Sequence, residues 1–273
     1  METVEWPEFI QRSRPGEPFS AGTVLKNAMT IGVFDGVHRG HQVLIEKITR
    51  RGPEYRPVVV TFKENPKKLL HNPGWKGDIL SMAQKMTIFR DLGVGLTVLI
   101  DFSGNFSKLS GRQFIDTLRL RGNLGYLAIG GNFRCGYRLD TDAARIKALN
   151  NAAGIPTDVV EPVGGGAHPV SSSLIRGAIA AGDFPRAASL LGRSVEVDLT
   201  GVAVSRRGEG VFYDLAAQHR ILPPRGRYPV LVYGESSPEV MAVEVTVVEG
   251  GILMDPPCKA ARVEFYHYGT QGE

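Results

Sequence analysis

From Met29 onward, short apolar runs alternate with longer segments in which apolar residues recur at helical spacing. Such alternation is typical of parallel strands joined by crossover helices. The predicted strands cover residues 29–33, 57–62, 95–100, 124–129 and 156–160. The predicted helices cover residues 41–51, 81–92, 110–121 and 142–153. We therefore expect an α/β domain built on a parallel sheet.

Single residues mark several of the predicted helix ends. Ser110 stands where an N-cap is expected, because its hydroxyl can accept a hydrogen bond from the first turn. Gly93 and Gly122 follow helix ends, where a left-handed backbone is often required. We expect a positive φ at both glycines.

The pattern changes in the last third of the chain. The run 171–176 opens another predicted helix, and a second short helix is predicted around 184–191. Four alternating segments then follow at 195–204, 228–233, 240–248 and 261–266. Gly and Pro separate these segments, which is typical of an antiparallel barrel or sandwich. We place a domain boundary near Arg193, with residues 1–193 as the α/β domain and 194–273 as a smaller β domain.

Composition narrows the classes of function. The chain has 42% hydrophobic and 22% charged residues, which is ordinary for a globular protein, and its net charge is +4. Because Lys and Arg are spread along the sequence, the charge suits small phosphorylated ligands better than nucleic acid. The chain has neither an apolar stretch of membrane-span length nor a secretory signal at its start, so we expect a cytoplasmic protein without a membrane partner. Two separated cysteines argue against a disulfide framework.

The segment 30–41 carries the clearest chemical signal. It reads as a strand that enters a glycine-bearing turn and continues directly into a helix. Gly32, Gly36 and Gly40 allow close approach of a ligand to the backbone, and the following helix directs its N–H groups at the same place. We expect an anion site at this turn.

His38 and His41 stand at that helix start, where their ring N–H groups could bond phosphate oxygens and stabilise charge during transfer. Metal binding is the competing interpretation, but a third ligand at suitable spacing is absent, and we predict no metal site. A third interpretation is a pair of ordinary surface histidines on a loop.

Two later segments could bind the same kind of ligand. Asn132 could hydrogen-bond a nucleotide through its amide or act as a turn residue. Ser171 and Ser172 open a predicted helix and can offer hydroxyl and backbone donors to phosphates. Arg176 lies one turn further and could grip phosphate with a forked pair of hydrogen bonds, although an ordinary N-cap followed by a surface arginine fits the same residues.

Together these segments resemble the bacterial bifunctional riboflavin kinase/FAD synthetase family. Residues 32–41 resemble its first motif, 131–136 its Gly-x-Asn/Asp-Phe-x-Phe-Gly segment and 170–176 its Ile-Ser-Ser-Thr-x-Ile-Arg motif, in the family's order. The likeness covers about residues 29–193. It implies a Rossmann-like nucleotidyltransferase domain followed by a smaller barrel-like domain. The implied activity is FMN adenylyltransferase, with ATP and FMN as substrates and Mg²⁺ accompanying ATP.

The resemblance also implies roles for individual residues. Four are expected to be catalytic: His38, His41, Ser172 and Arg176. Eight are expected to bind the nucleotide: Gly32, Phe34, Asp35, Gly36, Gly40, Asn132, Ser171 and Ser173. Phe62 and Pro66 are expected on the flavin side of the site. Because the attacking FMN phosphate is already anionic, the mechanism needs no general base and can rest on positioning and charge stabilisation.

The sequence departs from the family pattern at two places. Residues 61–66 stand where the family carries Thr-Phe-x-Pro-His-Pro, and Glu64 and Asn65 replace the first proline and the histidine. Glu64 would repel an anionic acceptor if it pointed inward, whereas an outward Glu64 would be harmless. Residues 208–217 stand where the family carries the Gly-Phe-Pro-Thr-Ala-Asn motif that holds Mg-ATP for the kinase, and the threonine and asparagine are absent.

We therefore predict that riboflavin kinase activity is lost, although Glu244 stands near the family's catalytic glutamate. The tail could then serve stability, docking to another copy in a homo-oligomer, or flavin retention. Two alternative functions stay open. One is a nucleotidyltransferase for another phosphorylated acceptor such as phosphopantetheine or a polyol phosphate, and the other is a non-catalytic flavin- or nucleotide-binding module.

Overall fold

The computed structural model describes residues 1–12, 25–70, 75–102, 106–164, 169–234, 240–255 and 257–266. The chain forms two compact units. The first comprises Met1–Asn72 and Met86–Pro169, and the second comprises Pro73–Lys85 and Val170–Glu273.

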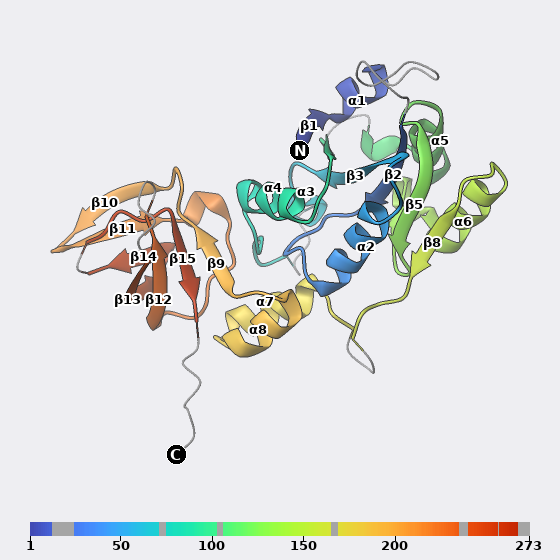
Figure 1. Cartoon of the computed structure of the whole chain (residues 1–273). Helices are drawn as coiled ribbons and strands as arrows, with labels where there is room; N and C mark the ends of the chain where they lie inside the picture. The colour runs from blue at the N-terminus through green and yellow to red at the C-terminus, as the bar shows by residue number, and fades with distance from the viewer. Residues whose placement is uncertain are drawn as a thin grey trace. The chain divides into compact units, whose positions relative to one another are not determined.

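A six-stranded parallel sheet forms the centre of the first unit. Its strand order is β1-β4-β3-β2-β5-β8, and Figure 1 labels these strands except β4. The strands are β1 (Glu2–Glu5), β2 (Lys26–Ile31), β3 (Tyr55–Phe62), β4 (Leu96–Ile100), β5 (Leu124–Gly130) and β8 (Thr157–Val160). The chain moves from β2 through β3 to β4 on one side and from β5 to β8 on the other, as in a Rossmann-like fold. This arrangement confirms the predicted parallel sheet.

Helices cover both faces of this sheet. One core cluster joins alternate residues of β2, β3, β4 and β5 to α1 (Trp6–Arg12), α5 (Gly111–Leu120) and α6 (Ala143–Asn151). Helix α2 (Arg39–Thr49) also contacts β2, β3 and β5, but its buried Leu44, Ile45 and Ile48 lie outside that cluster. It therefore packs on the opposite face, as right-handed crossovers require.

The remaining elements of the first unit are short. Helix α3 (Pro66–Leu69) follows β3, and the 3₁₀ helix η1 (Phe106–Lys108) precedes α5. Strands β6 (Arg134–Cys135) and β7 (Thr141–Asp142) form a small hairpin around η2 (Tyr137–Leu139). Helix α4 (Met82–Asp91) begins within the residues of the second unit and ends within those of the first.

The structure describes the three residues predicted at helix ends. Ser110 caps α5 in a reciprocal capping box with Gln113, which confirms its assignment. Gly93 has φ +83° as expected, but the prediction for Gly122 was wrong, because the left-handed residue is Asn123 at φ +47°. Gly122 is required for space instead. A Cβ there would lie 2.6 Å from the Leu118 carbonyl oxygen.

The second unit contains a seven-stranded antiparallel sheet, curled as a half-barrel, in the order β10-β11-β14-β13-β12-β15-β9. The strands are β9 (Val195–Asp198), β10 (Ala203–Arg207), β11 (Gly210–Asp214), β12 (Gly226–Tyr233), β13 (Val240–Val248), β14 (Gly251–Met254) and β15 (Arg262–Phe265). The short 3₁₀ helix η3 (Ala216–Gln218) follows β11. The expected antiparallel β domain is thus present, with more strands than the sequence pattern predicted.

Helices α7 (Ser172–Ala180) and α8 (Phe184–Leu191) belong to this second unit. The Phe184 ring stacks on Phe265 at 4.9 Å and meets Tyr228 edge-on at 5.6 Å, which joins α8 to the sheet. The compact units therefore divide the chain at Pro169/Val170, whereas the predicted domain boundary lies at Arg193.

Candidate active site

The predicted ligand residues of the first unit all lie beyond the carboxyl ends of neighbouring strands. Residues 32–41 follow β2, Asn132 follows β5, and Pro66 lies just beyond Phe62 at the end of β3. The strand order reverses between β2 and β5, and ligands of open α/β sheets bind in the crevice at such a switch point. The topology therefore gathers the first two motifs where a ligand is expected.

The turn after β2 has an unusual backbone. Phe34, Gly36 and Val37 have φ values of +51°, +85° and +39°, and Phe34, Asp35 and Val37 are buried. A positive φ is rare for a β-branched or bulky residue and persists only where the surroundings enforce it. Two contacts hold the turn, since Thr61 Oγ1 donates to the Val33 carbonyl at 3.1 Å and Gln42 Nε2 donates to the Val37 carbonyl at 2.9 Å.

The two histidines of the motif lie against each other at the start of α2. His38 is the N-cap residue of α2, and its carbonyl accepts hydrogen bonds from the N–H groups of His41 and Gln42. The rings of His38 and His41 are stacked, with centroids 3.6 Å apart and planes inclined by 16°. His38 is 6% exposed, and the Phe34 ring lies 5.0 Å from the His41 ring. The motif thus presents a fixed pair of imidazoles at a helix N-terminus.

Gly40 has a direct steric role in this arrangement. A Cβ at this position would lie 3.3 Å from the Cε1 and Nδ1 atoms of the His38 ring. Such a contact is tighter than van der Waals packing allows without a shift of the ring. The glycine of the His-x-Gly-His element therefore makes room for the stacked pair.

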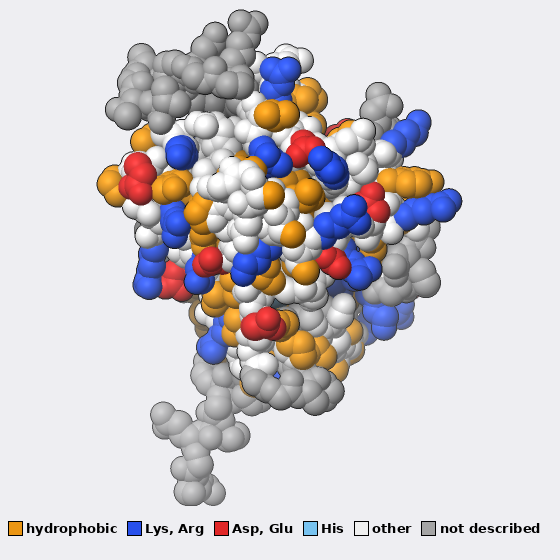
Figure 2. Space-filling view, turned by 90° about the vertical axis from the view of Figure 1, so that its right-hand side faces the viewer, with side chains coloured by type: hydrophobic (Ala, Val, Ile, Leu, Met, Phe, Trp, Pro, Cys, Tyr) orange, Lys and Arg blue, Asp and Glu red, His pale blue; other side chains and the backbone are white. Residues whose placement is uncertain are grey.

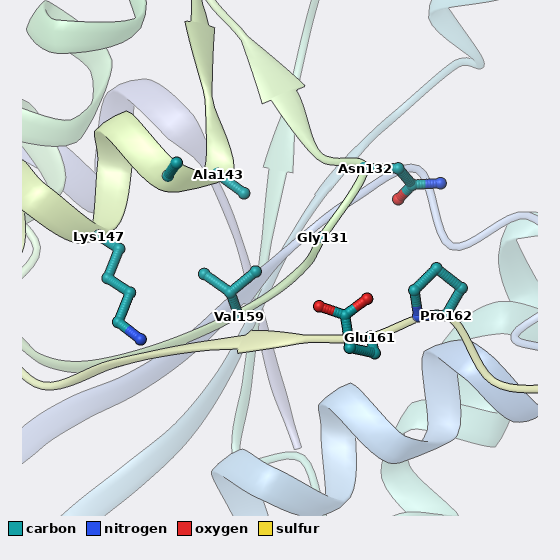
Figure 3. Close-up of a pocket in the computed structure, with 8 residues that line it drawn as sticks. Gly131, Asn132, Ala143, Lys147, Val159, Glu161 and Pro162 are labelled. Atoms are coloured by element: carbon teal, nitrogen blue, oxygen red, sulfur yellow. The ribbon is translucent and has the colours of Figure 1, made fainter.

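An open pocket of about 510 Å³ lies at the carboxyl ends of β5 and β8, against the start of α6. Figure 3 shows Asn132 and Pro162 near one end and Lys147 of α6 at the other, with Val159 between them. Glu161 supplies a carboxylate and Gly131 an open backbone. The pocket thus has both small apolar and polar lining residues.

Phe62, predicted on the flavin side, belongs to an aromatic cluster at the ends of β3 and β4. Its ring meets Phe102 at 5.7 Å and Phe106 at 6.3 Å, both nearly edge-on. Phe106 in turn contacts Trp6 at 5.6 Å. Phe62 is only partly buried, so an aromatic surface is accessible at this edge of the sheet.

The two residues that depart from the family pattern have clear structural partners. The Glu64 carboxylate lies 3.1 Å from Lys68 Nζ, and its side chain is 52% exposed. Asn65 is buried and caps α3, because its Oδ1 accepts a hydrogen bond from the Lys67 N–H at 3.1 Å. Glu64 therefore sits at the surface with a cation beside it, and Asn65 has a structural function.

Cys135, in the segment after Asn132, is a poor nucleophile. Burial, with a smaller contribution from Asp140, raises the pKa of its thiol to about 12. The thiol is therefore neutral at physiological pH.

The serine and arginine motif lies in the second unit. Ser171 caps α7 by accepting from the Leu174 N–H at 3.3 Å, Ser172 begins the helix, and Ser173 is exposed. Arg176 is 5% exposed, and its Nε donates to the Gly77 carbonyl at 2.7 Å. These residues are thus ordered within their own unit.

Sequence reasoning missed Gly77 in the second unit and Trp6, Lys147, Glu161 and Pro162 in the first. Glu161 and Pro162 directly follow a predicted strand, so the rule for carboxyl ends of strands could have found them. The contact of Gly77 with Arg176 spans 99 positions and leaves no local pattern.

Surface charge is mixed on the face shown, and the described residues contain neither a metal-ligand cluster nor a membrane-spanning helix. On the face shown in Figure 2, Lys and Arg side chains are interspersed with Asp and Glu. Across the described residues, no three His, Cys, Asp or Glu side chains gather as a metal site would require. A search of the same residues found no helix long and apolar enough to span a membrane.

Comparisons with known proteins agree with the motifs. A family model described as FAD synthetase matches residues 23–174. The chain is 26% identical over 212 residues to the bifunctional riboflavin kinase/FMN adenylyltransferase of Escherichia coli (strain K12), covering 76% of this chain and 68% of that protein. It is 29% identical over 213 residues to the protein of the same description from Bacillus subtilis (strain 168), covering 75% of this chain and 67% of that protein.

One solved structure matches almost the whole chain. A crystal structure described as a macrolide-efflux protein from Streptococcus pneumoniae gives a TM-score of 0.74 at 22% identity, covering 99% of this chain and 86% of that one. At this identity the match bears on the fold alone.

Proposed function

Because the chain belongs to the FAD synthetase family, we propose that it transfers the adenylyl group of ATP to the phosphate of FMN, giving FAD and pyrophosphate. The observation that carries this proposal is the stacked pair of His38 and His41 at the start of α2, at the switch point of a parallel sheet. A triphosphate placed there meets ring N–H groups, the first-turn N–H groups and the positive end of the helix dipole.

The reaction needs charge stabilisation more than proton transfer. An oxygen of the FMN phosphate forms a bond to the α-phosphorus of ATP while the bond between that phosphorus and the bridging oxygen of pyrophosphate breaks. Negative charge grows on the leaving group, and we assign the imidazoles of His38 and His41 to offset it. Because the attacking oxygen is already anionic, no side chain has to remove a proton.

The sequence motifs assign roles to the other predicted site residues. Asn132 and the backbone of 32–36 are assigned to nucleotide binding, with Phe34, Asp35 and Gly36 shaping the turn. Ser172 and Arg176, with Ser171 and Ser173 beside them, are assigned to phosphate contacts by the second-unit motif. Phe62 and Pro66 are assigned to the flavin side, where the aromatic cluster offers a surface for an isoalloxazine ring.

Mg²⁺ is proposed to arrive with ATP. Since no carboxylate or histidine cluster for a metal is found among the described residues, phosphate oxygens and water are its expected ligands. The ion would neutralise part of the triphosphate charge.

The structure bears on the objection to FMN raised by residue 64. Glu64 is paired with Lys68 and half exposed, so the carboxylate is partly neutralised where it stands. This arrangement removes the objection to FMN as the acceptor.

We also propose that riboflavin kinase activity is lost. The stretch that replaces the kinase motif runs from the turn before β11 to η3, and Glu244 lies on β13 with its carboxylate 3.5 Å from Arg227 Nη1. A single exposed carboxylate without a phosphate cradle is insufficient for phosphoryl transfer. Formation of FMN from riboflavin and ATP by the purified protein would contradict this part of the proposal.

One assay tests the main proposal. The full chain is incubated with ATP, Mg²⁺ and, in separate reactions, FMN, riboflavin, phosphopantetheine or a polyol phosphate, and FAD and pyrophosphate are quantified. FAD from FMN is the expected result. Pyrophosphate released only with another acceptor would identify a different nucleotidyltransferase, and nucleotide binding without pyrophosphate would identify a binding module.

A further inference from the structure

A short segment from the first half of the chain is fastened within the second unit. We call residues 75–81 the strap. Its Asp78 exchanges two backbone hydrogen bonds with the 219–221 loop, one to the His219 carbonyl at 2.9 Å and one from the Ile221 N–H at 3.1 Å. The Arg220 guanidinium donates to the Leu80 carbonyl.

Side chains add further contacts to the strap. Ser81 Oγ donates to Asp198 Oδ2 at 2.6 Å, which ties the end of the strap to the end of β9. The Trp75 ring lies 5.7 Å from His219, and its Nε1 donates to Asp78 Oδ1 at 3.2 Å. Backbone, hydroxyl and aromatic contacts thus fix this segment on the β domain (residues 194–273), called the barrel domain below.

The strap holds Arg176. The Gly77 carbonyl accepts a hydrogen bond from Arg176 Nε at 2.7 Å, and the arginine is 5% exposed. A free arginine side chain has high rotamer entropy, much of which it loses when it binds a phosphate. The hydrogen bond at Nε orders the guanidinium group before the phosphate binds, and this lowers the entropic cost of binding.

Only glycine fits at the contact. Gly77 has φ +114°, and a Cβ there would lie 2.8 Å from Ile221 N and 2.9 Å from the His219 carbonyl oxygen. These are backbone atoms, which cannot turn aside as a flexible side chain can. The close approach of the strap to the 219–221 loop therefore depends on the missing side chain.

We propose that the strap is a positioning device, in which the 219–221 loop and Asp198 of the barrel domain hold the Gly77 carbonyl, and this carbonyl holds Arg176 for its contact with ATP phosphate. The proposal rests on the adenylyltransferase function and on the role assigned there to Arg176. It gives the barrel domain, which lacks the kinase motif, a part in adenylyl transfer.

The test compares two glycines with similar backbone conformations. Gly77→Ala is measured beside Gly52→Ala, whose φ is +121° but whose nearest atoms belong to the flexible carboxylate of Glu54. We expect Gly77→Ala to lower kcat/KM for ATP by about tenfold or more, with KM for FMN changed by less than about twofold. Gly52→Ala should leave both constants within about twofold of wild type.

A double-mutant cycle separates positioning from general damage. If Gly77 acts through Arg176, the ATP effect of Gly77→Ala should disappear in an Arg176→Ala background. Equal changes for ATP and FMN, or the same ATP penalty in both backgrounds, would overturn the positioning role. If the wild type forms no FAD at all, the proposed function fails instead, so the two failures are distinguishable.

A milder pair of variants covers the case in which Gly77→Ala does not fold. Trp75→Phe removes the bond to Asp78 inside the strap, and Tyr228→Phe removes the 2.8 Å bond from Tyr228 Oη to the Pro224 carbonyl outside it. We expect kcat/KM for ATP to fall in Trp75→Phe and to stay at the wild-type value in Tyr228→Phe. Indistinguishable values in the two variants would count against the strap.

Discussion

The imidazole rings of His38 and His41 are stacked with centroids 3.6 Å apart, His38 being the N-cap of α2 and His41 lying in its first turn. The two rings pack against each other, Gly40 leaves room for the His38 ring, and the Phe34 ring lies 5.0 Å from the His41 ring. The two side chains should therefore behave as one functional group.

His41→Ala should lower kcat by about 10²-fold or more, since a preorganised donor to the developing charge is lost. The double variant His38→Ala/His41→Ala should lose little more than the single one, because the pair acts together. Steady-state assays with FMN measure both values. Glu46→Ala, on the same helix with an exposed partner at Arg50, is the matched control and should retain activity. Multiplicative losses in the double variant would show that the rings act independently.

Gly40→Ala should separate activity from stability. Alanine in the first turn of α2 is a better helix former by up to about 1 kcal/mol, yet its Cβ would push on the His38 ring. We expect kcat to fall by about tenfold while the urea midpoint stays equal or rises. If activity and stability fell together, a local unfolding of the turn would explain the variant better than a displaced ring.

Asn65→Ala should destabilise the protein by about 1 kcal/mol, because the cap of α3 is removed from a buried position. Asn65→Asp retains an oxygen that can accept from Lys67 N–H and should lose less. Equilibrium unfolding in urea compares the two variants. Equal stability of Asn65→Ala and wild type would mean that the cap contributes nothing to this short helix.

Asp158 should make the stability depend on pH. Burial acts to raise the pKa of its carboxyl, but hydrogen bonds from Lys47 and Tyr126 and the charge of Arg51 outweigh it and lower the pKa below its ordinary value of 3.8. A lowered folded-state pKa stabilises the fold above the unfolded pKa, and this contribution is lost as the pH falls through the folded value.

The decrease in Tm from pH 7 to pH 3 should accordingly be smaller in Asp158→Asn than in wild type. Asp91→Asn, which removes an exposed partner of Arg90, is the control and should keep the wild-type profile. Parallel profiles for Asp158→Asn and wild type would mean that Asp158 titrates in the folded protein as it does in the unfolded chain.

The local sequence pattern was sufficient to predict many of the strands and helices of this protein. The apolar runs at 57–62, 95–100 and 124–129 became β3, β4 and β5, and the helical spacing at 184–191 gave α8 with the same bounds. The glycines and histidines of 32–41 indicated a turn at a helix start, because the backbone freedom of glycine and the position of an N-terminus are local properties. The motif residues of the FAD synthetase family could be named from the sequence for the same reason.

Other features depend on contacts between distant residues. Strand β1 has four residues and a single buried side chain, and it forms only because β4 offers a parallel edge. Helix α8 joins the barrel domain through the contact of Phe184 with Phe265, so the compact units divide before α7 and not at Arg193. Arg176 meets Gly77 across 99 positions of sequence.

The sequence therefore determined most helices and central strands of the first unit, the strand–turn–helix motif and the family, because each is encoded by neighbouring residues. Tertiary structure decided which strand lies beside which, how the imidazoles of His38 and His41 stack, and which carbonyl holds Arg176. Those relationships arise from packing and hydrogen bonding between segments that the chain brings together only on folding.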